Sequence, residues 1–237
     1  MSAHHVSSRL FGAGILAGFA LDIASNFWLQ STIRTGPGAL GLIEGAAAQP
    51  EKIAAIVGMG LASSMIALLM AAWLCGMTVA RPIFWLALAF LGAKVATLGM
   101  DGLELASFQM MRSVGEAVAQ APGGAVVQAA EPLQLMVQAL RNGIHFPHMF
   151  VGGVSALLLY VILAAAGFIP RLFGAIGVVA CCSQLVGVFT GILGAEVNVA
   201  FLLPLFVVHL SLAVWLIVRG FPEGDAGGAA REMASNP

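Results

Sequence analysis

The stretch MFVGGVSALLLYVILAAAGF, residues 149–168, contains no charged side chain. A helix needs about 20 apolar residues to cross the hydrocarbon core of a bilayer. Helices also satisfy their own backbone hydrogen bonds, as a segment surrounded by lipid must. The stretch therefore predicts a membrane-spanning helix. The 237-residue chain has the same character, with 60% hydrophobic and 9% charged residues and a mean hydropathy of +0.98, against about 25% charged residues in soluble domains. We expect a protein integrated in a lipid bilayer.

Six segments of the chain meet the length criterion for a membrane span. They cover residues 10–29, 53–79, 83–107, 149–168, 172–193 and 199–218. We predict an all-α fold, a polytopic bundle of six transmembrane helices that forms a single domain over residues 1–220. The tail at 221–237 lacks periodic apolar residues and is expected to be a disordered cytoplasmic segment. The first apolar run is too long for a signal peptide and has no clear cleavage site, so we expect a retained helix.

Arginines at the predicted helix ends suggest an orientation. One arginine precedes the first span, one follows the last, and one lies in each of the short turns after spans two and four: Arg9, Arg219, Arg81 and Arg171. Because basic residues favour the cytoplasmic side, both termini are predicted to be cytoplasmic in a bacterial inner membrane. The longer loops, 30–52 and 108–144, then face outward. Basic residues are scattered singly and the formal net charge is -1, which argues against nucleic acid as a partner.

The second outer loop contains a helical pattern at EPLQLMVQALRNG, residues 131–143. Pro132 suits a first helical turn and Gly143 a helix end. Leu133, Met136 and Leu140 would give this segment an apolar side. Two interpretations remain open for this segment of the 113–143 outer loop: a separate interfacial or lid helix, or an extension of the fourth membrane span.

Charged residues within the third span lie on one face of the helix. At 100° per residue, the polar set shares an arc of about 80°; it comprises Lys94, Thr97, Asp101, Glu104 and Arg112. A charge near the bilayer centre costs at least about 2.5 kcal/mol, so this face should turn toward the bundle interior and find partners. The spacing favours Asp101 as the partner of Lys94, and Glu104 as the partner of Arg112 if the helix continues.

The depth of each polar residue follows from a rise of 1.5 Å per residue. Lys94 lies about 16 Å into a core about 30 Å thick, and His209 lies at a similar level. The other polar candidates fall in the outer half of the membrane: Asp22, Asn26, Asp101, Glu104, His145 and His148. Below them the spans are almost purely apolar. We expect an outward-facing polar pocket above a hydrophobic plug.

The types of residue in this pocket admit several chemistries. His145 and His148, at i and i+3, and the DxxE pair Asp101 and Glu104 are ligand types found in helix-bundle metal sites. A divalent metal bound by the two histidines is one hypothesis. The alternatives are a proton or substrate relay, and histidines that only hydrogen-bond nearby carbonyls while Asp101 neutralises Lys94. Haem is disfavoured, because His209 has no second histidine at its own depth.

The run GVSALLLYVILAAAGFIPRLFGAIGVVA, residues 153–180, together with RLFGAGILAG at 9–18, resembles a bacterial family of six-helix membrane proteins catalogued as domain of unknown function 4386. In that family a helix ends in a loop of the type G-F-x-P-R, matched here by Gly167, Phe168, Pro170 and Arg171. The resemblance implies a six-helix fold and an inner-membrane location. It implies no active site, because the family's role is not established.

Three functional hypotheses follow. The first is a pocket, formed by the polar residues at 22, 26, 94, 101, 104 and 209, that binds a small or amphipathic ligand in a membrane enzyme or sensor subunit. The second is a proton-coupled transporter with a Lys94, Asp101 and His209 relay. The third is an accessory subunit whose glycine-rich helix faces contact partner helices or a second copy of the chain.

Overall fold

The computed structural model describes residues 3–35, 38–120 and 124–221, and the predicted disorder of residues 222–237 lies outside these ranges. All secondary structure in the described part is helical. Its elements are α1 (Ala3–Ile23), a π-helix (Ala24–Leu29), α2 (Gln30–Ile33), α3 (Gly38–Ala48), α4 (Pro50–Thr78), α5 (Phe84–Gln120), α6 (Gly124–Ala165), α7 (Arg171–Ile192), a 3-10 turn (Val199–Phe201) and α8 (Leu203–Val218).

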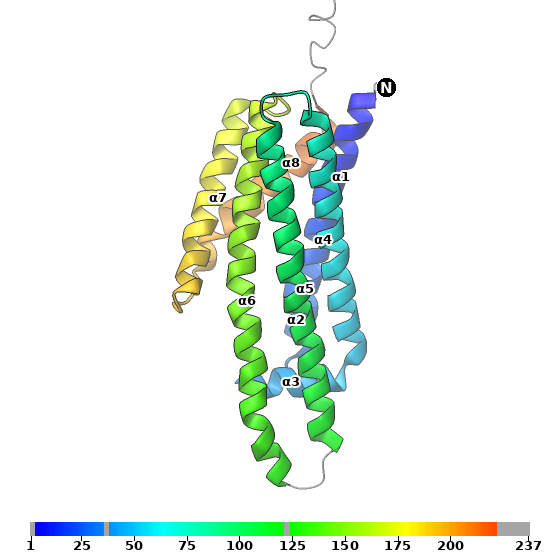
Figure 1. Ribbon diagram of the computed structural model, residues 1–237, viewed down its shortest axis with the longest axis vertical. Coiled ribbons are helices and arrows are strands. Elements are labelled where there is room, and N and C mark those ends of the chain that lie inside the picture. The colour runs from blue at the N-terminus through cyan, green and yellow to red at the C-terminus, as the bar shows by residue number, and fades with distance from the viewer. Residues whose placement is uncertain (1–2, 36–37, 121–123, 222–237) are drawn as a thin grey trace, which may run out of the picture.

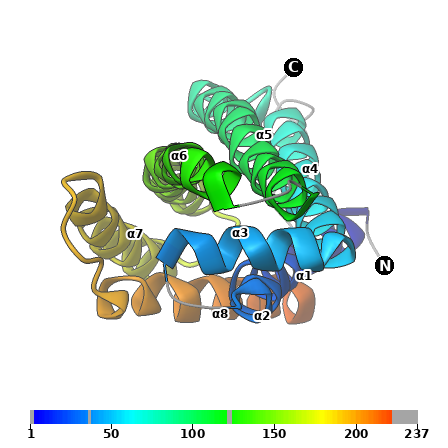
Figure 2. The ribbon, with the colours of Figure 1, turned by 90° about the horizontal axis from the view of Figure 1, so that it is seen from below.

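Six helical segments are long and apolar enough to cross a membrane, which confirms the predicted fold class. They form a closed ring. α1 packs on both α4 and α8. Each of the other spans packs on the next one in the chain: α4 on α5, α5 on α6, α6 on α7 and α7 on α8. Figure 2 shows this arrangement along the bundle axis. One end of the bundle holds the start of α1, the end of α8 and the two short turns, α4 to α5 and α6 to α7 (Figure 1).

The helices α5 and α6 are longer than predicted. The 37 residues of α5 span about 55 Å and the 42 of α6 about 63 Å, against about 30 Å of hydrocarbon. Figure 1 shows the two as an antiparallel pair that continues beyond the other helices. The loop expected at 108–144 is thus mostly wrong. Of the two interpretations of residues 131–143, the extension of the fourth span is correct. Pro132 and Pro147 both lie inside α6.

A short helix that hydropathy did not reveal, α3, crosses this end of the bundle (Figure 2). It packs against α5 and α6. Together with α2 and α4 these helices bury a compact apolar cluster, which we call the α3 cluster: Ile33, Leu42, Ile43, Ala46, Ile53, Ile56, Leu105, Phe108, Met111 and Val137. Contacts of Phe108 and Met111 in this cluster explain why α5 continues after Ser107, where the membrane span was expected to end.

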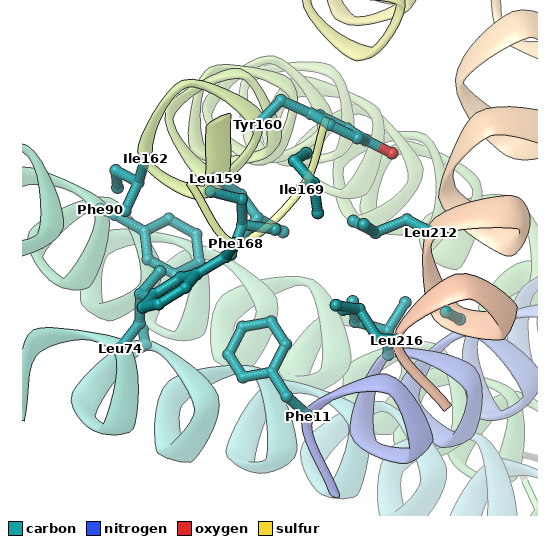
Figure 3. Close-up of a cluster of buried hydrophobic side chains, with 14 of the residues drawn as sticks. Phe11, Leu74, Phe90, Leu159, Tyr160, Ile162, Phe168, Ile169, Leu212 and Leu216 are labelled. Carbon is teal, nitrogen blue, oxygen red and sulfur yellow. The ribbon is translucent and has the colours of Figure 1, made fainter. Parts of the chain in front are cut away.

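A second apolar cluster fills the end of the bundle that carries the termini. Apolar side chains from all six spans meet here (Figure 3), among them Phe11, Leu74, Phe90, Tyr160, Ile162, Leu163, Phe168, Leu212 and Leu216. No charged residue belongs to this cluster in the described chain, and it occupies the position expected for the hydrophobic plug. Phe221, the first residue of the expected tail, is 1% exposed and stacks on Phe168 at 4.4 Å.

The turn between α6 and α7 closes this cluster. Gly167 adopts φ 72°, a conformation that residues with a side chain rarely adopt, and Phe168 N–H donates to the carbonyl of Leu163 at 2.8 Å. Arg81, from the turn between α4 and α5, donates to the carbonyl of Ala166 at 2.7 Å and covers the Phe168 ring. The two short turns are therefore tied to each other.

Candidate functional site

A cavity of about 360 Å³ lies in the centre of the helix ring, and all six spans contribute to its wall. Most of the wall is apolar, with Ile15, Phe19, Ile66, Met70, Phe90, Met149, Leu159, Leu205 and Phe206. Three ionisable side chains reach the cavity from different helices: Asp22 from α1, Lys94 from α5 and His209 from α8. Sequence depth placed Lys94 and His209 at one level, and the structure brings them to one cavity.

Lys94 has no carboxylate ion-pair partner among the described residues. The expected pair with Asp101 is absent, and the ammonium lies 5.8 Å from the centre of the Phe90 ring instead. Asp22 is the acidic residue whose charge acts on Lys94. His209 Nδ1 lies 3.2 Å from the hydroxyl of Tyr160, which is fully buried. The cavity thus contains an ammonium group that is not neutralised by direct contact.

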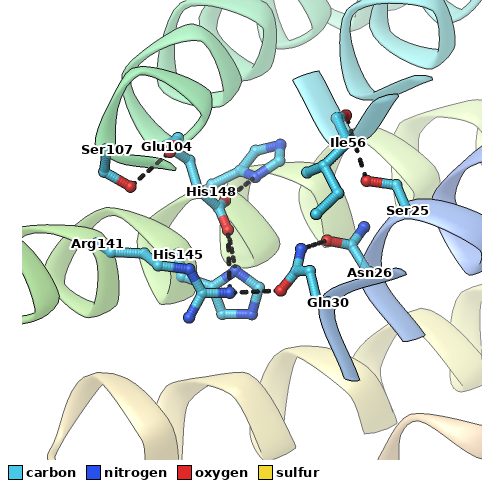
Figure 4. A network of polar contacts seen from close by, with 9 residues as sticks. All are labelled: Ser25, Asn26, Gln30, Ile56, Glu104, Ser107, Arg141, His145 and His148. Atoms are coloured by element: carbon cyan, nitrogen blue, oxygen red, sulfur yellow. Dashed lines mark hydrogen bonds and ion pairs between the residues drawn. The ribbon is translucent and has the colours of Figure 1, made fainter. Parts of the chain in front are cut away.

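A second polar group lies where α5 and α6 leave the ring (Figure 4). We call it the Glu104 cluster: Asp101, Glu104, Arg141, His145 and His148. The carboxylate of Glu104, whose side chain is only 6% exposed, contacts His145 Nδ1 at 2.8 Å through one oxygen and His148 Nδ1 at 3.2 Å through the other. Sequence spacing predicted the residue pairs on each helix, and the antiparallel packing of α5 on α6 brings them together.

Arg141 extends the cluster toward α1. Its Nη2 donates to Gln30 Oε1 at 2.8 Å and lies 3.9 Å from Glu104, while its guanidinium covers the Phe108 ring. Gln30 in turn donates to Asn26 Oδ1 at 2.8 Å. Asn26 lies in the π-helix, a widened helical turn that often occurs at functional sites. The chain of contacts links the π-helix, α2, α5 and α6 by side chains alone.

The remaining charged residues of α5 pair differently from the prediction. Asp101 accepts a hydrogen bond from Ser64 of α4. Arg112 pairs with Glu116 one turn further along the helix at 2.7 Å, so the expected pair with Glu104 is wrong. Glu104 finds its partners on α6 because that helix packs along the polar face of α5 up to this level.

The central cavity and the Glu104 cluster are neighbours rather than one site. Seven residues, or about 10 Å of helix, separate Lys94 from Asp101. Asp22 belongs with Lys94, because both side chains line the central cavity, whereas Asp101 does not. The polar side chains of α5 from Lys94 to Glu104 thus run from the cavity toward the end of the bundle where α5 and α6 extend, and the apolar cluster of Figure 3 shares Phe90 and Leu159 with the cavity wall.

Sequence analysis overlooked several residues of these two sites. Tyr160 is the single tyrosine of the chain, and a buried tyrosine usually finds a hydrogen-bond partner. Gln184, a polar residue within an apolar span, lines the cavity. Arg141 lay in a segment assigned to a loop, and Ser64 gave no signal, because serine is common in membrane helices.

Comparison with known proteins identifies the chain at the level of a family. A family model described as "Domain of unknown function (DUF4386)" matches residues 10–220. The chain belongs to this family. No curated protein and no solved structure matches it.

The match covers the whole helix ring of this DUF4386 protein and confirms the family resemblance that the Gly167–Arg171 turn suggested. It also includes both polar sites, from Asp22 to His209. Because the family description assigns no activity, the chemistry has to be argued from the residues of these sites.

Proposed function

We propose that this DUF4386 protein lies in the bacterial inner membrane with both termini in the cytoplasm. Support comes from the distribution of basic residues. The arginines near the helix ends beside the termini, Arg81 and Arg219, contact aromatic rings and have no acidic partner among the described residues. At the opposite end Arg112 and Arg141 are each close to a glutamate. The four arginines near the helix ends on this side, Arg9, Arg81, Arg171 and Arg219, favour this end as the cytoplasmic one.

We infer that the central cavity binds a small or amphipathic ligand that carries an acidic group. The observation that carries this proposal is Lys94, a lysine that lines a largely apolar cavity and has no ion-pair partner among the described residues. An intramembrane charge of this kind is costly unless it has a functional partner. The cavity volume of about 360 Å³ falls within the usual range for small-molecule sites.

The walls fit a ligand with an apolar part. Phe27, 73% exposed, and Phe206, 41% exposed, line the cavity and also contribute to the outer surface of the bundle. A ligand dissolved in the bilayer could therefore enter beside α1 and α8 and place its acidic group at Lys94. Asp22 and His209 would provide further hydrogen bonds. The apolar cluster on the terminal side blocks continuation toward the proposed cytoplasmic end.

The test uses the two lysines of the chain as a matched pair. Wild-type protein, Lys94→Met and Lys52→Met are purified in a mild detergent, and bound compounds are extracted and compared by mass spectrometry. Lys52 contacts Thr32 at the outer surface and does not line the cavity. We expect an acidic compound in wild type and Lys52→Met that is at least tenfold depleted in Lys94→Met. Equal retention by all three proteins, or no bound compound in any, would contradict the proposal.

A second candidate function is proton-coupled transport, and the succession of Lys94, Asp22, Asp101, His148 and Glu104 favours it. These groups could pass a proton between the outer surface and the cavity. In vesicles containing the purified protein, uptake of the cavity ligand should follow an imposed proton gradient. Uptake that is unchanged in Asp101→Asn would exclude Asp101 from any relay.

A further inference from the structure

Oxygen and nitrogen donor atoms converge within the Glu104 cluster, outside the central cavity. Asp101 and Glu104 stand one turn apart on α5, and His148 faces them from α6. One ligand atom of each residue lies within 4.8 Å of the other two. Two elements of the ring thus supply three potential ligands at one point.

The spacing of these atoms suits an ion. Zn²⁺ and related metals bind imidazole nitrogen and carboxylate oxygen at about 2.0–2.2 Å, which puts adjacent ligand atoms about 3 Å apart. His148 Nδ1 lies 3.2 Å from Glu104 Oε2. This contact is a hydrogen bond when the ring nitrogen carries a proton, and it has the length of one edge of a coordination polyhedron when the nitrogen does not.

We propose that Asp101, Glu104 and His148 bind one divalent first-row transition-metal ion. Their donors are one imidazole and two carboxylates, which suit Zn²⁺, Mn²⁺ or Fe²⁺ and include no thiolate of the kind that selects Cu(I). The imidazole disfavours Ca²⁺ and Mg²⁺, which prefer oxygen ligands. Two carboxylates balance the double charge of the ion.

His145 acts as a positioning residue for this site. Its Nδ1 lies 2.8 Å from Glu104 Oε1, the oxygen that His148 does not contact. A hydrogen bond to a coordinating carboxylate fixes the orientation of that ligand, and loss of such a partner typically weakens metal binding about 10–100-fold. Arg141, 3.9 Å from Glu104, is held by Gln30 and so does not occupy the ligand positions.

The ion can reach the site from the end of the bundle where α5 and α6 leave the ring. His145 and His148 are 30% and 25% exposed, whereas Glu104 is 6% exposed. The histidines therefore form the accessible side of the site and the carboxylate its interior. The proposal does not depend on a ligand in the central cavity, since none of the three metal-binding residues lines it.

Direct metal binding tests the proposal. The parent protein for this test carries His4→Ala and His5→Ala, which remove two adjacent histidines that could bind metal themselves, and it has no polyhistidine tag. It is stripped of metal with EDTA and titrated with Zn²⁺. We expect about one bound ion per chain. Asp101→Asn and His148→Ala should each weaken binding at least tenfold. Glu116→Gln and His209→Ala, which change a carboxylate and a histidine elsewhere, should not.

Positioning by His145 has its own readout. His145→Ala should weaken Zn²⁺ binding about tenfold without reducing the stoichiometry, and His145→Gln, whose amide can still donate to Glu104, should restore most of the affinity. Absence of saturable binding in the parent protein, or unchanged binding in both Asp101→Asn and His148→Ala, would overturn the proposal.

A spectroscopic variant guards against loss of folding. Co²⁺ is added to His148→Cys, and the absorption spectrum is compared with that of the parent protein, both showing a single peak on gel filtration. A thiolate-to-cobalt charge-transfer band in the variant alone would place residue 148 on the ion. If the folded variant binds Co²⁺ without this band, residue 148 is not a ligand and the proposal fails.

Discussion

Replacement of Glu104 by glutamine should destabilise the protein far more than the same replacement at Glu116. Both residues are glutamates of α5 with basic partners. Glu104 is 6% exposed and contacts two histidines, whereas Glu116 is 39% exposed and contacts one arginine that is itself 36% exposed. The comparison therefore holds the substitution and the helix constant and changes only burial and the number of partners.

The magnitude follows from the contacts. A glutamine keeps one acceptor oxygen, so either His145 or His148 loses its acceptor and faces an N–H group. Hydrogen bonds to charged groups contribute about 1.5–3 kcal/mol each, and the partial exposure of the histidines argues for the lower part of this range. Arg141 also loses the nearest negative charge. We expect a loss of about 2 kcal/mol for Glu104→Gln, and of about 0–0.5 kcal/mol for the exposed pair.

The assay is thermal unfolding followed by tryptophan fluorescence in one detergent, with EDTA present so that a bound ion does not contribute. For a chain of this size, 1 kcal/mol corresponds to about 2–4 °C. The apparent Tm of Glu104→Gln should therefore fall by about 4–8 °C and that of Glu116→Gln by less than about 2 °C. Equal shifts in the two variants would refute the view that the Glu104 cluster holds α5 and α6 together.

Three further predictions concern other parts of the bundle. A Cβ at Gly177 would overlap the Tyr160 ring, so Gly177→Ala should lower the free energy of unfolding by about 1–3 kcal/mol. The control Gly76→Ala, whose Cβ would have nothing within 4 Å, should leave the Tm unchanged or raise it. Equal Tm values for the two variants would contradict the close contact of α6 and α7. Tyr160→Phe removes the hydroxyl 3.2 Å from His209 and should lower stability by about 1 kcal/mol, measured in the same assay against Phe173→Leu, a change outside this hydrogen bond. In a cysteine-free background, Gln120→Cys should react with a membrane-impermeant maleimide in intact cells and Val79→Cys only after lysis; the reverse pattern would invert the proposed orientation.

Hydropathy predicted the membrane spans well because the bilayer imposes a single requirement on each of them. The run at 149–168 had to be helical wherever its neighbours lay. Outside the hydrocarbon this requirement ends. The continuation of α5 past Ser107 depends on Phe108 and Met111 meeting α3, a tertiary contact with no local signature. Pro132 was expected in the first turn of a helix, yet α6 begins before it and continues through both Pro132 and Pro147.

The sequence predicted which residues belong to the candidate site better than it predicted which of them contact one another. The polar face of α5 was evident from helical spacing, and it does face other helices. Which helix supplies each partner depends on packing, so Lys94 lines a cavity with Asp22 and His209 and does not pair with Asp101. Arg141 joined Glu104 from a segment assigned to a loop. Spacing along one helix cannot rank a partner on the same helix against one on a neighbour.

The unequal helix lengths make the protein sensitive to the membrane around it. α7, with 22 residues, and the 20-residue segment Val199–Val218 match an ordinary bilayer and fix the vertical position of the bundle. In a thicker bilayer acyl chains would cover more of the outside of the longer α5 and α6, whereas Glu104 itself stays inside the bundle. The thickness of the bilayer thus sets how far lipid reaches along α5 and α6 at the level of the Glu104 cluster.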